Sequence, residues 1–152
     1  MSTWTTQAIV DGTPEDVLEV LSDPESCYRW SPIDFDLEDL DSERLETGSI
    51  ARVAGRVAGL SVSFEIEVLE VGAGRLALTA RGPMTLEVEY EAYPAADGGA
   101  EVWATVTVRA SRSLTGRLAA ASTETLLRAG ALSMALRRIA AEVQRRVERV
   151  PA

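Results

Sequence analysis

The last quarter of the chain carries the longest hydrophobic periodicity. Between residues 115 and 150, apolar or small side chains recur every three or four positions, and no proline interrupts the pattern. This spacing is typical of one face of an α-helix. The stripe consists of Leu118, Ser122, Thr125, Ala129, Leu132, Leu136, Ile139, Val143 and Val147. The pattern predicts a single helix over residues 115–150, about 50 Å long at 1.5 Å per residue.

The opposite face of this predicted helix is charged. It carries Arg117, Glu124, Arg128, Arg137, Arg138, Glu142, Arg145 and Arg146. Most of the stability of such a helix comes from packing its apolar face against other elements. We therefore expect the rest of the chain to supply a surface that covers the stripe.

Residues alternate between apolar and polar over seven shorter segments, which is the period of a half-buried strand. These segments are residues 3–10, 33–41, 48–57, 60–71, 75–81, 84–94 and 101–110. Gly-rich turns at 72–74, 82–83 and 96–99 separate several of them. Short turns join antiparallel strands, so the last six segments predict a meander, and we expect the first strand to pair with the last.

Two short helices are predicted between the first two strands. Thr13 is a good N-cap, and Pro14 follows at the first helical position, which indicates a helix over residues 13–21. Asp23 and Pro24 repeat this signal for a helix over residues 23–29. The predicted class is α+β, a single domain over residues 1–152.

Charge and composition limit the kinds of partner and the cellular location that we expect. The net charge is −9 and the isoelectric point about 4.6, which argues against nucleic acid and anionic membranes as main partners. No run approaches the length of apolar residues that an integral membrane segment needs. The N-terminal residues lack the features of a secretory signal, and there is one cysteine, so we expect a cytoplasmic protein.

The chain contains no histidine and only Cys27 as a thiol. This excludes Ser-His-Asp and Cys-His catalysis and the usual zinc sites, and we expect neither a metal nor another cofactor. Residues 34–46 are strongly acidic, but carboxylates at strand spacing point to one exposed face and do not converge on a cation. We interpret that stretch as a solvated edge, and Cys27 as unreactive.

Three motifs at the start of the chain carry a family resemblance. Residues 10–17 (VDGTPEDV), 21–25 (LSDPE) and 30–32 (WSP) resemble the opening of the START-like (SRPBCC) superfamily, nearest its polyketide cyclase/dehydrase-like group. The resemblance implies a helix-grip fold, in which a seven-stranded antiparallel sheet curls around a long C-terminal helix and leaves a cavity. Members of the superfamily bind lipids, sterols or polyketides, some catalyse cyclisation or dehydration, and others are cochaperones.

Inward strand positions and the helix stripe are the candidate ligand-binding residues. They are Trp30, Phe64, Ile66, Leu78, Leu86, Val88, Tyr90, Val106, Leu118, Ser122, Thr125, Ala129 and Leu132. Small and hydroxyl side chains on the stripe favour a cavity, because they leave room and can orient a ligand. Plain core packing is the alternative for all of them.

Several side chains have two interpretations. Trp30 either lines the cavity mouth or anchors the short helices, and Tyr90 either donates a hydrogen bond to a ligand or belongs to the core. Trp103 is either an outward aromatic residue or part of a contact in a homodimer. Arg52 and Arg56 share a strand face and would pair with glutamates across the strands. Either of these, or Arg109, could instead turn inward to meet a ligand carboxylate.

These patterns favour binding of a small hydrophobic ligand, lipid-like or polyketide-like, between sheet and helix. A polyketide cyclase or aromatase is the alternative, but enolisation needs a general base. Without histidine that base would be a buried carboxylate, and no Asp or Glu interrupts an inward apolar run. A protein-interaction module, as in the cochaperone members, is the third interpretation.

Overall fold

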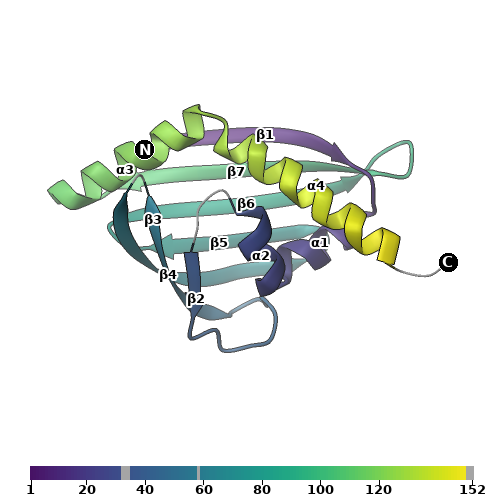
Figure 1. The fold of residues 1–152 in the computed structure, drawn as a ribbon, viewed down its shortest axis with the longest axis horizontal. Helices are drawn as coiled ribbons and strands as arrows, with labels where there is room; N and C mark the ends of the chain where they lie inside the picture. The colour runs from purple at the N-terminus through teal and green to yellow at the C-terminus, as the bar shows by residue number, and fades with distance from the viewer. Residues whose placement is uncertain (32–34, 58, 150–152) are drawn as a thin grey trace.

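The computed structural model describes residues 1–31, 35–57 and 59–149, and it is built on one antiparallel sheet (Figure 1). The strand order is β1-β7-β6-β5-β4-β3-β2. The predicted meander and the pairing of the first strand with the last are both confirmed. The strands are β1 (Ser2–Val10), β2 (Phe35–Glu38), β3 (Ile50–Val57), β4 (Leu60–Gly72), β5 (Arg75–Arg81), β6 (Met84–Pro94) and β7 (Ala100–Ala110).

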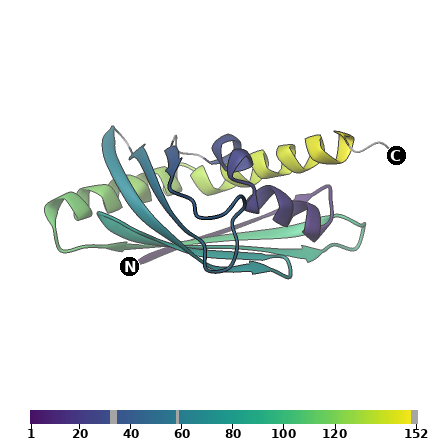
Figure 2. The same cartoon turned by 90° about the horizontal axis from the view of Figure 1, so that it is seen from below.

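Four helices complete the chain: α1 (Pro14–Ser22), α2 (Pro24–Trp30), α3 (Leu114–Arg128) and α4 (Ala131–Arg149). They lie on one side of the sheet, and the β2–β4 end of the sheet curls up toward them (Figure 2). This arrangement confirms the α+β class and the helix-grip architecture, with a long C-terminal helix and two short helices after the first strand. The predicted strand over residues 33–41 is shorter, and its start at Ile33 lies outside the described residues.

The two short helices begin where the capping residues predict. The Thr13 hydroxyl accepts a hydrogen bond from the Asp16 N–H (3.1 Å), and the Asp16 carboxylate accepts one from the Thr13 N–H (2.9 Å). This reciprocal capping box satisfies two backbone donors at the start of α1. Asp23 ends α1 and caps α2, because its carboxylate accepts from the Glu25 N–H (3.1 Å). The local sequence therefore sets the angle at which α1 and α2 enter the fold.

The prediction of one unbroken helix over residues 115–150 was wrong. Helix α3 ends at Arg128, and Gly130 has φ +94°, in the left-handed region that glycine adopts without strain. Helix α4 then starts in a new direction at Ala131 (Figure 1). A glycine inside a periodic pattern thus marked the end of one helix and the start of the next.

The break also changes which face of α3 packs inward. Its buried residues are Gly116, Ala119, Ala120 and Thr123, one position away from much of the predicted stripe. In α4 the prediction of the inward face is correct as far as Val143. Leu132, Leu136, Ile139 and Val143 are all buried, but Val147 is exposed. Glu142, predicted on the outer face, is buried, with only 3% of its surface exposed.

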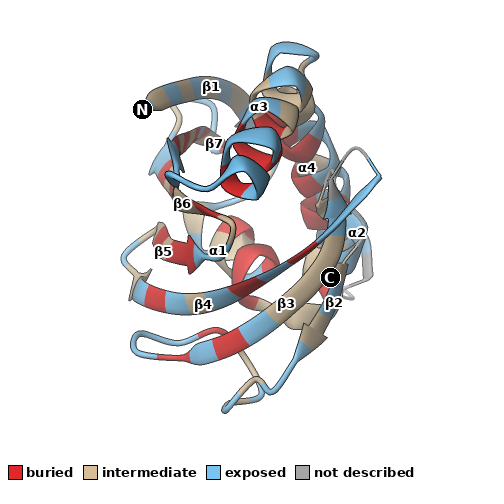
Figure 3. Cartoon of the chain, turned by 90° about the vertical axis from the view of Figure 1, so that its left-hand side faces the viewer, coloured by how far each residue is buried: buried red, intermediate tan, exposed pale blue. Residues whose placement is uncertain are grey.

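The concave face of the sheet and the facing helix surfaces form the core (Figure 3). Alternation along β7 buries Val102, Ala104, Val106 and Val108 on one face and leaves the residues between them more exposed. Helix α4 lies against β1 and α1. The opposite, outer face of the sheet is polar, and this leaves the concave side as the place for a ligand.

Charged side chains on the outer face pair across strands, as predicted for neighbouring rows of opposite charge. Arg75 bonds Glu89 at 2.8 Å, Arg81 bonds Glu67 at 3.3 Å, and Arg109 lies 3.2 Å from Glu87. Arg52 and Arg56 are also exposed. None of these arginines turns into the core. Trp103 is on the same outer face, where its indole N–H donates to Glu101 (2.9 Å).

Candidate ligand-binding cavity

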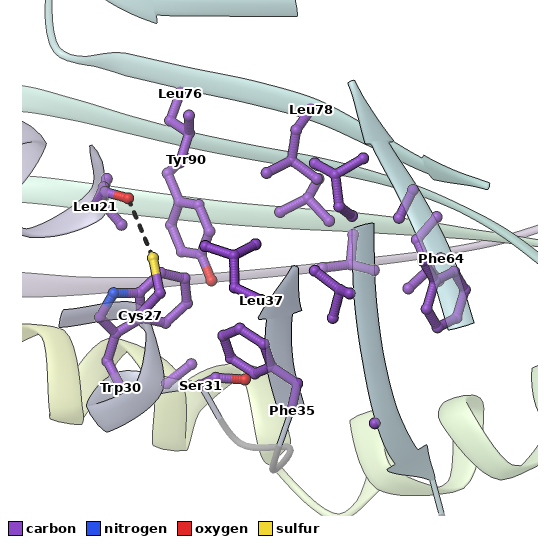
Figure 4. A pocket seen from close by; sticks show the side chains of 18 of the residues that line it. Leu21, Cys27, Trp30, Ser31, Phe35, Leu37, Phe64, Leu76, Leu78 and Tyr90 are labelled. Atoms are coloured by element: carbon purple, nitrogen blue, oxygen red, sulfur yellow. Dashed lines mark hydrogen bonds between the residues drawn. The ribbon is translucent and has the colours of Figure 1, made fainter. Parts of the chain in front are cut away.

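A cavity of about 270 Å³ lies between the concave face of the sheet and the helices, and it is partly open to solvent (Figure 4). Strands β2–β7 line one side, and α1, α2 and the α3–α4 junction line the other. Nearly all of the lining side chains are aliphatic or aromatic. Pockets that hold small organic ligands usually range from roughly 300 to 1,000 Å³, so this cavity is slightly smaller than that range.

The middle of the sheet is under-filled. Ile66, Leu78, Leu86 and Val88 point to the concave side, yet each keeps part of its surface accessible. A close-packed core would bury such side chains completely. Their accessibility therefore comes from space that no side chain of the described chain occupies.

Tyr90 supplies the main polar group of this space. Its ring is buried and lies edge-on to Trp30, with centroids 5.6 Å apart and planes at 75°. Figure 4 shows its hydroxyl pointing into the cavity. Burial raises the pKa of Tyr90 above its usual value, and no hydrogen bond contributes to that shift. A neutral phenol held in this way can donate a hydrogen bond to an oxygen acceptor in an otherwise apolar site.

Two other polar groups at the cavity, the Thr123 hydroxyl and the Cys27 thiol, have partners within the chain, whereas the buried indole N–H of Trp30 has none among the described residues. The Thr123 hydroxyl donates to the Ala119 carbonyl (2.9 Å) within its own helix. The Cys27 thiol donates to the Leu21 carbonyl at a sulfur–oxygen distance of 3.6 Å. Burial, helped by the nearby Asp23 carboxylate, raises the pKa of Cys27 to about 12. At neutral pH this cysteine is therefore a protonated thiol and a poor nucleophile.

None of the lining residues within the described ranges carries a charge. The buried carboxylate of Glu142 does not line the cavity, and it is held by arginines. Its Oε2 accepts from Arg29 Nε at 3.0 Å, and its Oε1 lies 2.6 Å from Arg145 Nη2. Glu142 thus stabilises the contact between α2 and α4 and has no access to a ligand in the cavity.

Most of the predicted site residues do line the cavity. These are Trp30, Phe64, Ile66, Leu78, Leu86, Val88, Tyr90, Val106 and Leu132. The remaining ones lie elsewhere: Leu118 is 52% exposed, Thr125 and Ala129 are exposed, and Ser122 is half-buried. The reason is that α3 turns a different face toward the sheet from the one that the sequence pattern predicted. Whether any of these residues contacts a ligand stays a prediction.

Part of the lining was not predicted from the sequence. Helix α3 contributes Thr123, Leu126 and Leu127, and the α2–β2 region contributes Phe35 and Leu37. The end of helix α3 at Gly130 was the available signal for the first group. The second group depends on how the edge strand β2 lies against α2, where Phe35 stacks on Tyr28 with centroids 5.0 Å apart. No local pattern encodes that contact.

Neither a metal centre nor a membrane span is found in the part of the chain that the structure describes. Its residues hold no group of three or more acidic, Cys or His side chains that could bind a metal ion. Among the described helices, none is both long and apolar enough to cross a bilayer.

Comparison with known proteins places the fold. No protein-family model and no curated protein sequence matches this chain. Solved structures do match. TTHA0849 from Thermus thermophilus superimposes with a TM-score of 0.73 at 17% identity, covering 94% of this chain and 97% of that one. Zhui aromatase/cyclase from Streptomyces sp. R1128 superimposes with a TM-score of 0.71 at 19% identity, covering 96% of this chain and 95% of that one.

A START superfamily protein from Mycobacterium smegmatis gives a TM-score of 0.64 at 17% identity, covering 88% of this chain and 93% of that one. At such identities the likeness concerns the fold. It agrees with the resemblance of the motifs at residues 10–17, 21–25 and 30–32, and it extends over nearly the whole length of each chain. The chain therefore has the START-like, helix-grip fold.

Proposed function

We propose that this protein binds a small, uncharged, largely apolar molecule in the cavity between its sheet and helices. The observation that carries the proposal is the under-filled centre of the sheet, where Ile66, Leu78, Leu86 and Val88 keep accessible surface although they point inward. Leaving such side chains against an empty space forfeits dispersion contacts that a bound apolar molecule would restore. The cavity is therefore suited to an occupant.

The lining defines the chemistry of that occupant. Because the described lining residues are uncharged, an ionised carboxylate or phosphate would lose its hydration without compensation. The Tyr90 hydroxyl offers one hydrogen bond within the cavity, near Trp30. A compact aromatic or alicyclic molecule with one carbonyl or hydroxyl oxygen fits this combination. A lipid-like or polyketide-like compound satisfies these requirements if its polar end remains at the mouth.

We favour binding over cyclase or aromatase chemistry. One matched structure is an aromatase/cyclase, but enolisation requires a base within reach of the substrate. In this chain the buried carboxylate, Glu142, is ion-paired with Arg29 and is not part of the cavity lining. The Cys27 thiol is protonated at neutral pH. The groups at the cavity are thus suited to holding a molecule and poorly suited to moving its protons.

Native mass spectrometry of the purified protein, followed by organic extraction, tests the proposal. We expect a mass increment that disappears on denaturation and a small apolar compound in the extract. If the protein is recovered empty, titration with a panel of neutral naphthalene derivatives, followed by tryptophan fluorescence, replaces the first measurement. A protein that is empty and also binds no member of this panel would rule out the proposed function.

A further inference from the structure

We propose that one end of this acidic protein docks on an anionic phospholipid bilayer. We call it the arginine–leucine end, and its members are Arg56, Leu60, Arg112, Leu114, Arg117 and Leu118. Figure 3 looks onto this end of the molecule, where the tips of β3 and β4 and the start of α3 lie. The proposal concerns the surface of the protein and stands independently of the ligand proposed above.

Three chain segments meet at this end. A Cβ atom on Gly82 would lie 2.4 Å from the Ser63 carbonyl oxygen, so the β5–β6 turn is packed tightly against β4. A Cβ atom on Gly116 would lie 2.3 Å from the Pro83 carbonyl oxygen, so the same turn is packed against α3. The first residues of β4, the β5–β6 turn and the start of α3 therefore lie side by side at this end of the molecule.

The charge of this surface is opposite to that of the whole protein. Residues 56–64, 80–86 and 109–123 contain five arginines and no Asp or Glu, whereas the chain as a whole has a net charge of −9. Arg81 and Arg109 are paired with Glu67 and Glu87 on the outer face of the sheet. Within the described ranges no ion pair involves Arg56, Arg112 or Arg117. Three exposed, uncompensated arginines are therefore available to an anionic partner.

Exposed leucines lie close to these arginines in the sequence. Leu114 is 73% exposed, Leu118 is 52% exposed and Leu60 is 36% exposed. Leu114 and Leu118 are four residues apart in α3, so they project from the same face of the helix. The first turn of α3 contains no acidic residue. Arginines near a helix N-terminus oppose the helix dipole, so they do not serve the stability of α3.

Apolar side chains flanked by arginines are characteristic of segments that lie in the membrane interface. The leucines would enter the headgroup region while the arginines meet lipid phosphates, each strengthening binding about fivefold at an anionic surface. The leucines project from the start of a helix and from a strand end next to a hairpin turn. A fluid lipid surface accommodates this shape better than a rigid acidic protein does.

Vesicle flotation with the full chain tests the proposal. We expect binding to phosphatidylcholine vesicles only when phosphatidylglycerol is included, and loss of that binding at high salt because exposed charges are screened. The double variants Arg112→Gln/Arg117→Gln and Leu114→Ser/Leu118→Ser should each weaken binding at least about tenfold. The matched control is Arg137→Gln/Val147→Ser, which replaces an exposed arginine and an exposed valine on α4, and it should bind as the parent protein does.

Two outcomes would overturn the proposal. One is the absence of binding to anionic vesicles, and the other is an equal loss of binding in the control variant. If the chain ignores vesicles but binds polyglutamate through Arg112 and Arg117, the surface belongs to an acidic protein partner and the bilayer proposal fails. Circular dichroism of each variant verifies its fold. Binding of a neutral naphthalene probe reports separately on the cavity, so failure at this surface is distinguishable from failure of the proposed function.

Discussion

Trp30 lies edge-on against Tyr90, with ring centroids 5.6 Å apart and an angle of 75° between the planes. The two residues come from α2 and β6, so this contact joins a short helix to the middle of the sheet in the wall of the cavity. It also fixes the tyrosine ring with its hydroxyl directed at the empty space (Figure 4).

Replacing Tyr90 with Phe should remove the preference of the cavity for oxygen-bearing ligands. We expect the parent protein to bind 2-acetylnaphthalene more tightly than 2-ethylnaphthalene by about three- to tenfold, the value of one net hydrogen bond. Tyr90→Phe should bind the two probes equally. Quenching of tryptophan fluorescence measures both affinities. If the variant still prefers the ketone, Tyr90 does not contact the ligand oxygen.

Filling the cavity with a larger side chain should abolish the binding of probe molecules and leave the stability of the fold nearly unchanged. Val88→Phe places a larger side chain in the space, so we expect stability within about 1 kcal/mol of the parent protein and loss of probe binding. Val108→Phe is the control, because Val108 is fully buried in the core and does not line the cavity. Overpacking there should destabilise the fold by about 1–3 kcal/mol. Urea denaturation compares the two, and similar losses of stability would mean that the space at Val88 is already filled.

The bend between α3 and α4 should depend on glycine. Gly130 has φ +94°, and no atom stands within 4 Å of the position where its Cβ would be, so a side chain there meets backbone strain alone. We expect Gly130→Ala to reduce the free energy of unfolding by about 1–2 kcal/mol. Gly130→Asn should reduce the free energy of unfolding by a smaller amount, because asparagine tolerates this conformation better than alanine does. Equal losses in the two variants would contradict the assignment of the cost to backbone strain.

The buried carboxylate of Glu142 should contribute to the stability of the fold through its ion pair with Arg29. Glu142→Ala leaves Arg29 without its partner at 3.0 Å and opens a space between α2 and α4. We expect a loss of about 1–3 kcal/mol, less than for a fully buried pair because Arg29 is half-exposed. The double variant Arg29→Met/Glu142→Met should recover much of that loss. Thermal unfolding of the parent protein, Arg29→Met, Glu142→Met and the double variant forms a double-mutant cycle, and strict additivity would show that the pair is not coupled.

Alkaline pH should destabilise the protein through its buried thiol. Folding raises the pKa of Cys27 from its ordinary value near 9 to about 12. The unfolded chain therefore releases this proton first, and the stability that the neutral thiol contributes is lost as the pH rises from about 9 through about 12. Cys27→Ala should flatten part of this decline in urea titrations across that range. Tyr90 has a raised pKa in the same direction, so some decline should remain. An unchanged profile in Cys27→Ala would mean that the thiol is not desolvated.

Much of this architecture was predictable because its signals are local. Alternation along β4, β5 and β6 placed Phe64, Leu78 and Val88 on the concave face, since the period of a strand leaves only two choices of face. The caps at Thr13 and Asp23 located α1 and α2. The class, the meander and most of the sheet side of the cavity follow from these periods, which are properties of the backbone.

The helical side of the cavity and its unfilled space depend on the packing of elements that are distant in the sequence. In a continuous pattern, Gly130 is one weak position, and its left-handed conformation becomes decisive only when α4 packs on β1. The buried position of Glu142 depends on Arg29 arriving from α2, more than a hundred residues earlier in the sequence. Whether inward side chains meet or leave a space depends on the curvature of the sheet and the distance of the helices. The alternation along the strands therefore determined which strand residues face inward, and the packing between distant elements determined what they enclose.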